Sequence, residues 1–137
     1  MRKLAGAKYG LKGPSAIASD GTHVWVGNAS RSVAELQAST GALVRLIKAT
    51  SYKFDLVQAI ASNGTNVWVV SDLVASVTEL NASTGALVRA IQGSKYAFLV
   101  PSAIALDGAH VWVPNSNGNS VTELLASTGA LVQVLKG

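Results

Sequence analysis

The stretch Asp107-Gly-Ala-His-Val-Trp-Val-Pro-Asn-Ser-Asn-Gly-Asn-Ser-Val-Thr-Glu-Leu-Leu-Ala-Ser-Thr-Gly129 decides the fold of this chain. It opens with an Asp-Gly turn, and β-branched and aromatic side chains alternate after that turn, as in a pleated and half-buried strand. A polar loop separates this strand from a second one, Ser-Val-Thr-Glu-Leu. The closing Ser-Thr-Gly predicts a hairpin whose glycine is left-handed. The stretch therefore predicts antiparallel strands joined by short turns.

The same pattern occurs three times along the chain. The segment 38–44, which reads Ala-Ser-Thr-Gly-Ala-Leu-Val, returns unchanged at 82–88 and at 126–132, 44 residues apart each time. The tryptophans Trp25, Trp68 and Trp112 are spaced by 43 and then 44 residues. A fixed period of this length indicates tandem copies of one supersecondary unit.

Each copy is expected to form four strands. The first strands are predicted at 15–19, 58–62 and 102–106, and each is followed by Asp-Gly or Asn-Gly, which predicts a two-residue type I′ hairpin. The second strand carries the tryptophan and the third reads Ser-Val-Ala/Thr-Glu-Leu. A three-residue turn, with Gly41, Gly85 or Gly129 in the left-handed position, leads to the fourth strand. A connector with a tyrosine then reaches the next copy, and no helical period interrupts this order.

Four antiparallel strands in a repeat of about 40 to 45 residues form a β-propeller blade. We therefore predict an all-β chain with an N-terminal connector at 1–13 and blades at 14–57, 58–100 and 101–137. Propellers close with about 4 to 8 blades, so three blades would leave two apolar blade faces bare. Such faces favour association. We expect a ring closed by oligomerisation, with six blades from two chains favoured and nine blades from three chains as the alternative.

The segment 107–124 with the following 126–129 resembles the YVTN-type propeller repeat, which is related to NHL repeats. Members of that family show a Val-aromatic-Val-x-Asn strand, an Asn-rich loop, a Ser/Thr-Val strand and a Thr-Gly turn, and the resemblance extends over all three copies. It implies a propeller that serves as a scaffold, a binding module or occasionally an enzyme, and an extracytoplasmic origin is compatible with it. The chain departs from the family at Glu35, Glu79 and Glu123, where an apolar residue is usual, and at 70–73 in the middle copy.

The two ends of the chain lie at matching phases of the repeat. Gly137 has the same phase as Gly93 and Gly6, so the end of one chain would meet residue 6 of the next. Residues 1–5 repeat the phase of the final strand, 131–135, and are expected to be frayed or packed across the joint. The sequence thus favours a non-enzymatic scaffold whose partner is itself, with a propeller fragment, an amplified ancestral gene and an engineered symmetric protein all left open as origins.

Composition excludes several classes of protein. Half of the residues (49%) are hydrophobic and only 13% are charged, which is unlike a disordered chain. Without cysteine there is no disulfide or thiolate zinc site. The net charge of +4 is scattered, so no nucleic-acid partner is expected. No apolar run suits a membrane span, and the basic start leads into no apolar segment of a signal peptide.

Three sets of repeated residues, the glutamates, the tryptophans and the histidines, are assigned to the scaffold. No catalytic residue, cofactor or metal is therefore expected. Glu35, Glu79 and Glu123 fall opposite Arg45, Arg89 and Gln133 across the Ser-Thr-Gly turn, as in cross-strand pairs. If these pairs are exposed, removing one carboxylate should cost about 1 kcal/mol or less. The tryptophans are expected to pack between blades. His23 and His110 of the first and third copies are replaced by Asn66 in the middle copy, which favours exposed hairpin positions.

The remaining candidate is a ligand site on one face, which gives the alternative function of a small-ligand or carbohydrate-binding module. Connectors and the loops between second and third strands emerge on the same side of a propeller, around its central opening. Aromatic, basic and amide groups there suit a sugar or a small anion. The residues of this predicted ligand face are Lys8, Tyr9, Tyr52, Lys53, Lys95, Tyr96, Arg31, Asp72, Asn115 and Asn117.

Overall fold

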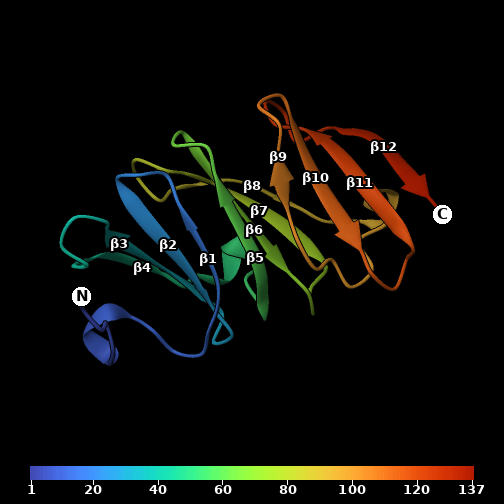
Figure 1. Ribbon diagram of the computed structural model, residues 1–137. Coiled ribbons are helices and arrows are strands. Elements are labelled where there is room, and N and C mark those ends of the chain that lie inside the picture. The colour runs from blue at the N-terminus through green and yellow to red at the C-terminus, as the bar shows by residue number, and fades with distance from the viewer.

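The structure is a computed structural model that describes residues 1–137. It contains three four-stranded antiparallel sheets, each made of four consecutive strands (Figure 1). The first sheet holds β1 (Pro14–Ser19), β2 (His23–Asn28), β3 (Ser32–Gln37) and β4 (Leu43–Ile47). The second holds β5 (Val57–Ser62), β6 (Asn66–Ser71), β7 (Ser76–Asn81) and β8 (Leu87–Ile91). The third holds β9 (Ala105–Leu106), β10 (His110–Asn115), β11 (Ser120–Leu125) and β12 (Leu131–Lys136). The predicted all-β propeller architecture is confirmed, with each sheet forming one blade.

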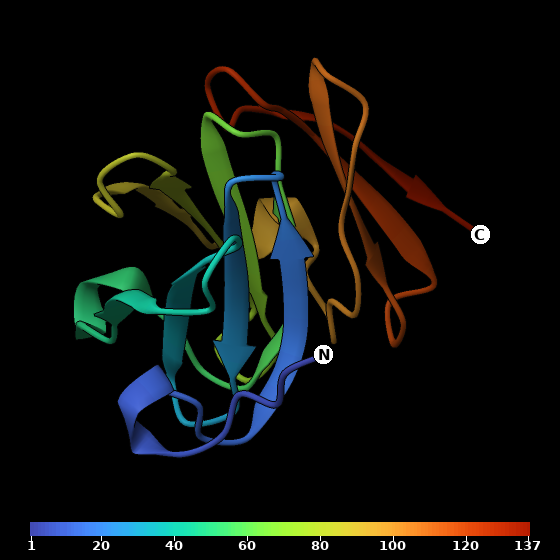
Figure 2. The ribbon, with the colours of Figure 1, turned by 60° about the vertical axis from the view of Figure 1, so that its left-hand side comes forward.

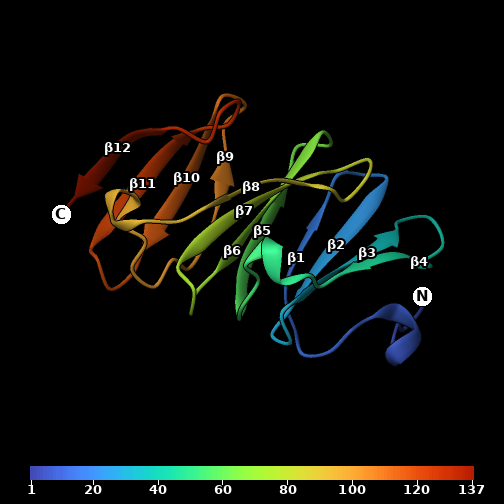
Figure 3. The ribbon, with the colours of Figure 1, turned by 180° about the vertical axis from the view of Figure 1, so that it is seen from behind.

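The three blades stand in a row in chain order, and the two termini lie at its opposite ends (Figures 1 and 3). The first strands of blades 1 and 2 lie next to each other, and the Ser15 hydroxyl on β1 donates to the Val57 carbonyl on β5 at 2.6 Å. The apolar core lies between the sheets rather than within one. One buried cluster joins blade 1 to blade 2 around Trp25, and a second joins blade 2 to blade 3 around Trp68.

The connectors form short 3₁₀ turns that the strand pattern does not predict. They are η1 (Ala7–Tyr9), η2 (Thr50–Tyr52) and η3 (Ser94–Tyr96). Each is followed by a left-handed residue, which is Gly10 in the first copy but Lys53 and Ala97 in the others. L-residues reach this region only where surrounding contacts hold them there. The connectors are therefore shaped by packing against the neighbouring strands.

The turn between the first two strands of each blade differs from the predicted type I′. Asp20 and His23 close the turn, because the Asp20 N–H donates to the His23 carbonyl at 3.2 Å. The central pair is therefore Gly21-Thr22, and only Gly21 has a positive φ, as in a type II′ turn. The Asp20 carboxylate accepts from the Thr22 and His23 N–H groups. This aspartate acts as an Asx-turn residue outside the central pair, which explains the shift by one position.

The turn between the third and fourth strands is one residue longer than predicted. The Gln37 N–H donates to the Ala42 carbonyl, which leaves Ala38–Gly41 as a four-residue loop, and the other two blades match it. The glycine prediction itself is confirmed, since φ is +75° at Gly41 and similar at its two equivalents. The loop still ends on a left-handed glycine, so the register of the Glu-Arg pairs is as predicted.

The first strand of blade 3 is shorter than the predicted 102–106. It covers only Ala105–Leu106, and an isolated bridge joins Pro101 to Asn115. The reason lies in the facing strand, where Pro114 takes the place of Gly27 in blade 1 and Val70 in blade 2. Proline has no N–H to donate, so the ladder is interrupted at this point.

Candidate functional site

The three repeated glutamates are buried. The small cost expected for removing one carboxylate applied only if the pairs were exposed, and they are not. Their exposed fractions are 0% for Glu35, 3% for Glu79 and 5% for Glu123. The opposite residues are those predicted: Arg45 Nε lies 2.7 Å from Glu35 Oε2, Arg89 Nε lies 2.9 Å from Glu79 Oε2, and the Gln133 amide donates to Glu123 at 2.7 Å. The two arginine contacts are ion pairs without hydrogen-bond geometry. All three glutamates are thus buried within a blade and contact the residue opposite them on the fourth strand.

Histidine completes this arrangement in two blades. His23 Nε2 lies 3.5 Å from Glu35 Oε1, and His110 Nε2 lies 3.5 Å from Glu123 Oε1. Both rings are half-buried, so the expected exposed hairpin positions are wrong. Burial raises the pKa of Glu35 and of Glu79, because the loss of water disfavours the carboxylate more than the nearby arginine favours it.

Replacing Glu79 by glutamine should change the free energy of unfolding at pH 7 by no more than about 1 kcal/mol, because the amide removes a desolvated charge from a buried site. The pKa of Glu79 is raised in the folded state, so between pH 4.5 and that pKa the folded state binds more protons than the unfolded one. Glu79 therefore lowers stability as pH rises through this window. The Glu79→Gln variant should lack that decline in urea unfolding measured from pH 4 to 7 at fixed protein concentration.

A control variant and one contrary outcome complete this test of the Glu79 pKa. Glu79→Ala is the matched control, because it removes the ion-pair partner of Arg89 without putting a polar group in its place and should cost about 1 to 3 kcal/mol. A difference between parent and Glu79→Gln that stays constant from pH 4 to 7 would show that the carboxylate has the same pKa in both states.

The tryptophans occupy the positions predicted for residues that pack between blades. Trp25 and Trp68 are buried in the first and second inter-blade clusters. Trp112 has the same place on β10, but no blade follows it, and it is partly exposed. Its indole N–H donates to Asp107 Oδ2 at 2.9 Å. The outer face of blade 3 therefore presents one unpaired member of a set whose other two members are buried.

Most of the ten residues of the predicted ligand face are engaged in contacts with other residues of the chain or are exposed. Lys8 Nζ lies 4.9 Å above the Tyr9 ring, and Lys95 Nζ lies 5.0 Å above the Tyr96 ring. The Tyr52 hydroxyl donates to the Gly85 carbonyl at 3.0 Å. The tyrosines thus pair with residues next to them or with the next blade.

The loop residues of that face are likewise paired with other residues of the chain, buried, or exposed outside any cavity. Arg31 is exposed and pairs with Asp55, on the connector between blades 1 and 2, at 3.2 Å. Asn115 is buried and donates to Ser120 and Thr122. Asp72 is half-buried, and Lys53 and Asn117 are exposed. Of the ten residues only Tyr52 lines a cavity, a shallow one beside β4 and the β7–β8 turn. The structure does not bring the ten residues together in one pocket.

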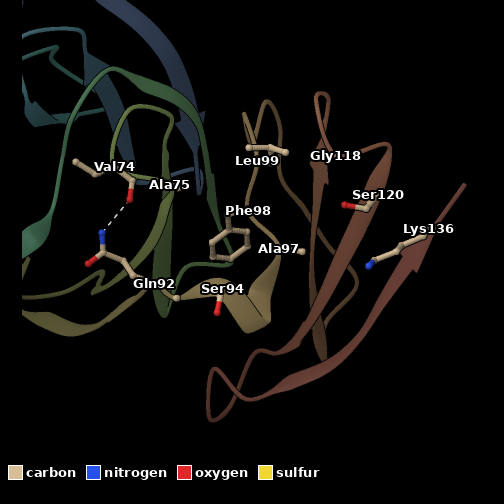
Figure 4. Close-up of a pocket in the computed structure, with 11 residues that line it drawn as sticks. Val74, Ala75, Gln92, Ser94, Ala97, Phe98, Leu99, Gly118, Ser120 and Lys136 are labelled. Atoms are coloured by element: carbon tan, nitrogen blue, oxygen red, sulfur yellow. Dashed lines mark hydrogen bonds between the residues drawn. The ribbon is translucent and has the colours of Figure 1, made fainter.

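A larger groove lies between blades 2 and 3 on the loop side, with a volume of about 690 Å³ (Figure 4). Gln92, Ser94, Phe98, Ser120 and Lys136 are among the residues that line it. A smaller cavity beside blade 1 is lined by the equivalent part of the first copy, including Ala7, Leu11, Ser32 and Lys48. The groove therefore recurs as a feature of the repeat, which favours a structural origin over a dedicated ligand site.

The outer face of blade 1 carries apolar side chains that no neighbouring blade covers. We call it the blade 1 open face and define it by Leu11, Ile17, Val24, Val26 and Leu36. Ile17 is 69% exposed, whereas its equivalent Ile60 is buried in the cluster between blades 1 and 2. A cavity of about 280 Å³ on this face is lined mainly by apolar side chains, among them all five residues of this set.

The blade 3 open face is the counterpart at the other end of the row. It consists of Trp112, Val121 and Leu135, whose equivalents in blade 1 are Trp25, Val33 and Ile47. Those equivalents are buried against blade 2, but Leu135 is 47% exposed. Both ends of the row thus carry an apolar face without a neighbouring blade, although Val26 and Leu36 on the blade 1 open face are buried.

The N-terminal segment, residues 1–6, lies on the blade 1 open face (Figure 2). Arg2 Nη2 donates to the Ser39 carbonyl at 3.0 Å, and Leu4 packs on Val26, Ala34 and Leu36. Residues 1–5 form no strand. Residues 1–5 were expected to be frayed or packed across the joint, and here they pack on the chain's own first blade. The repeat phase that Arg2 shares with Arg45 is the signal in the sequence for this place.

No helix in the structure reaches the length and hydrophobicity needed to cross a membrane. No group of three or more potential metal ligands lies together.

No protein-family model and no curated protein matches this sequence. Solved structures do resemble it. BamB from Moraxella catarrhalis shares 20% identity with a TM-score of 0.72, over 90% of this chain and 37% of that one. Kuenenia stuttgartiensis hydrazine synthase shares 21% identity with a TM-score of 0.72, over 89% and 36%. The computationally designed Ika4 protein shares 19% identity with a TM-score of 0.78, over 98% and 78%.

These structures are β-propeller proteins, and the likeness shows the fold alone. The chain spans little more than a third of the first two proteins and about four fifths of the designed one.

Proposed function

We propose that this chain is a non-enzymatic propeller scaffold, or a propeller fragment, that joins further copies of itself into a closed ring. One observation carries the proposal: the two open faces are the two halves of an interface that the chain already makes twice. Blade 1 meets blade 2, and blade 2 meets blade 3, through equivalent residues. The designed neighbour, which the chain matches over most of both lengths, is consistent with a scaffold of this kind.

The complementarity of the open faces can be followed residue by residue. Trp25 shares a buried cluster with Ile60, Val67 and Leu80 of the next blade. The equivalents of these three on blade 1 are Ile17, Val24 and Leu36, which line the 280 Å³ cavity. Trp112 of one copy would therefore insert into this cavity of the next copy. A head-to-tail contact of this type closes when its rotation divides a full turn.

We further infer that the repeat is of the YVTN/NHL type. The inference rests on the Val-Trp-Val strand, the Ser-Val strand and the Thr-Gly turn of all three copies, and on the Asn-containing loop of the first and third copies. The structure contains a strand or a turn at each of these motifs.

Native mass spectrometry on the 137-residue chain tests ring closure directly. We expect a mass of two times 14.0 kDa, for six blades, with three times that mass as the alternative for nine blades. Small-angle scattering should then show a closed and not an elongated particle. A stable monomer at micromolar concentration, or open-ended polymers, would contradict the proposal, because a closing head-to-tail contact leaves no free faces.

A further inference from the structure

We propose that the N-terminal segment is an intramolecular cap that holds the place of the incoming β12 on the blade 1 open face. This proposal rests on ring closure as the proposed function. In the monomer, residues 1–6 would cover the docking surface. On assembly they would give way to β12 of the second copy, so the segment sets the concentration at which rings form.

The polar contact of the segment copies the contact between blades. Arg45 on β4 donates from Nη2 to the Ser83 carbonyl of the next blade at 3.3 Å, and Arg89 on β8 does the same to Ser127 at 3.4 Å. Arg2 donates from Nη2 to the Ser39 carbonyl at 3.0 Å. Ser39, Ser83 and Ser127 occupy the same position of the repeated turn. Arg2 therefore stands where the fourth strand of a preceding blade would place its arginine.

The apolar contact is copied as well. A Cβ atom placed on Gly85 would lie 3.2 Å from Cδ1 of Ile47, and one on Gly129 would lie 3.1 Å from Cδ1 of Ile91. The same construction on Gly41 meets Cδ2 of Leu4 at 2.9 Å. Each turn glycine is thus covered by the residue two positions after the arginine. In a ring, the residues of β12 at these phases are Gln133 and Leu135, so the cap and the incoming strand need the same space.

The cap is held more weakly than the strand that would replace it. The backbone of residues 1–5 makes no hydrogen bond to other backbone groups. By contrast β12 pairs with β11 from Ser120↔Lys136 to Leu124↔Leu131. The incoming strand arrives already ordered on its blade and brings Trp112 with it. Because ordering costs are met before docking, β12 should win this competition once copies are concentrated enough.

The double variant Arg2→Ala/Leu4→Ser tests the cap, because it removes both contacts without touching either open face. We expect the ring to dissociate at a protein concentration about tenfold lower than for the parent, the factor that corresponds to 1.4 kcal/mol. Lys3→Ala is the matched control, since Lys3 is exposed and lies between the two contacts. Sedimentation equilibrium over a dilution series measures all three proteins.

A single thiol provides a second measurement, since the chain has no cysteine of its own. In Leu4→Cys the thiol should react slowly with a thiol reagent in the dilute monomer and faster as the ring forms and releases the segment. Slower labelling on assembly would mean that the segment is buried in the joint, which would overturn the cap.

The outcomes separate the cap from the ring. If parent and double variant form rings with equal affinity, the cap is wrong and the ring stands. If the double variant associates more weakly, the segment helps to build the joint, with Arg2 facing Glu123 of the preceding copy, and the cap is again wrong. If neither protein associates, ring closure and the cap fail together.

Discussion

Trp68→Ala is expected to unfold the chain or to lower its free energy of unfolding by about 3 to 5 kcal/mol, the usual cost of truncating a large buried aromatic side chain. Trp68 is 2% exposed and lies in the cluster that joins blades 2 and 3, together with Val77, Phe98 and Val111. A domain of this size has about 5 to 15 kcal/mol in total, so the loss is a large share. Thermal unfolding followed by circular dichroism measures the effect.

Two further variants serve as comparisons for Trp68→Ala. Trp25→Ala should behave like Trp68→Ala, because Trp25 is equally buried in the first inter-blade cluster. Val88→Ala is the mild control, because this side chain of the same blade is 41% exposed. A melting temperature for Trp68→Ala close to that of Val88→Ala would refute packing of the tryptophans between blades.

Trp112→Ala is expected to abolish assembly at concentrations where the parent is a ring, while the blades remain folded. Buried tryptophans at interfaces typically contribute 2 to 4 kcal/mol when truncated, so each joint should weaken by about 30- to 1,000-fold. The partial exposure of Trp112 in the single chain limits the cost to folding. Light scattering reports the oligomer, and the melting temperature of the parent should depend on protein concentration where that of the variant does not.

Val132→Ala is the matched control for the joint. Val132 is 45% exposed on β12, and its equivalents Val44 and Val88 stay exposed although their blades have neighbours. This position therefore lies outside every inter-blade contact, and its truncation should leave the ring intact. If Trp112→Ala assembles as well as Val132→Ala does, the proposed joint is not made through the blade 3 open face.

The strands could be predicted from the sequence because the repeat multiplies every local signal by three. The alternation around Trp112 and the identical Ser-Thr-Gly segments predict the strand order within each blade and the residue opposite each glutamate, and both agree with the structure. The Glu35–Arg45 pairing was predictable from counting across a turn. Its burial was not, because a strand pattern does not say which blade will cover the pair.

The connectors were the least predictable part. Leu56 and Val100 have φ values of 44° and 53°, and nothing in their type suggests a left-handed backbone. The equivalent residue of the first copy, Gly13, does suggest it, so comparison between copies held a signal that each copy alone lacked. The predicted ligand face failed to converge for a similar reason. The Tyr52 hydroxyl bonds from its connector to the next blade, and the Asn115 amide bonds within its own blade, and both contacts depend on the packed structure.

Gln133 gives the proposed ring a built-in order of disassembly. Arg45 and Arg89 each form an ion pair with the glutamate of their own blade and a hydrogen bond with the turn of the following blade, so each connects two blades. Gln133 is shorter and turns back to Glu123, so the last blade has no such connection to offer its neighbour. Each interface between copies would then lack the arginine hydrogen bond that both interfaces between blades of one chain possess. Heat or dilution should open the ring at the interfaces between copies first and release whole three-blade units before any blade separates from the next.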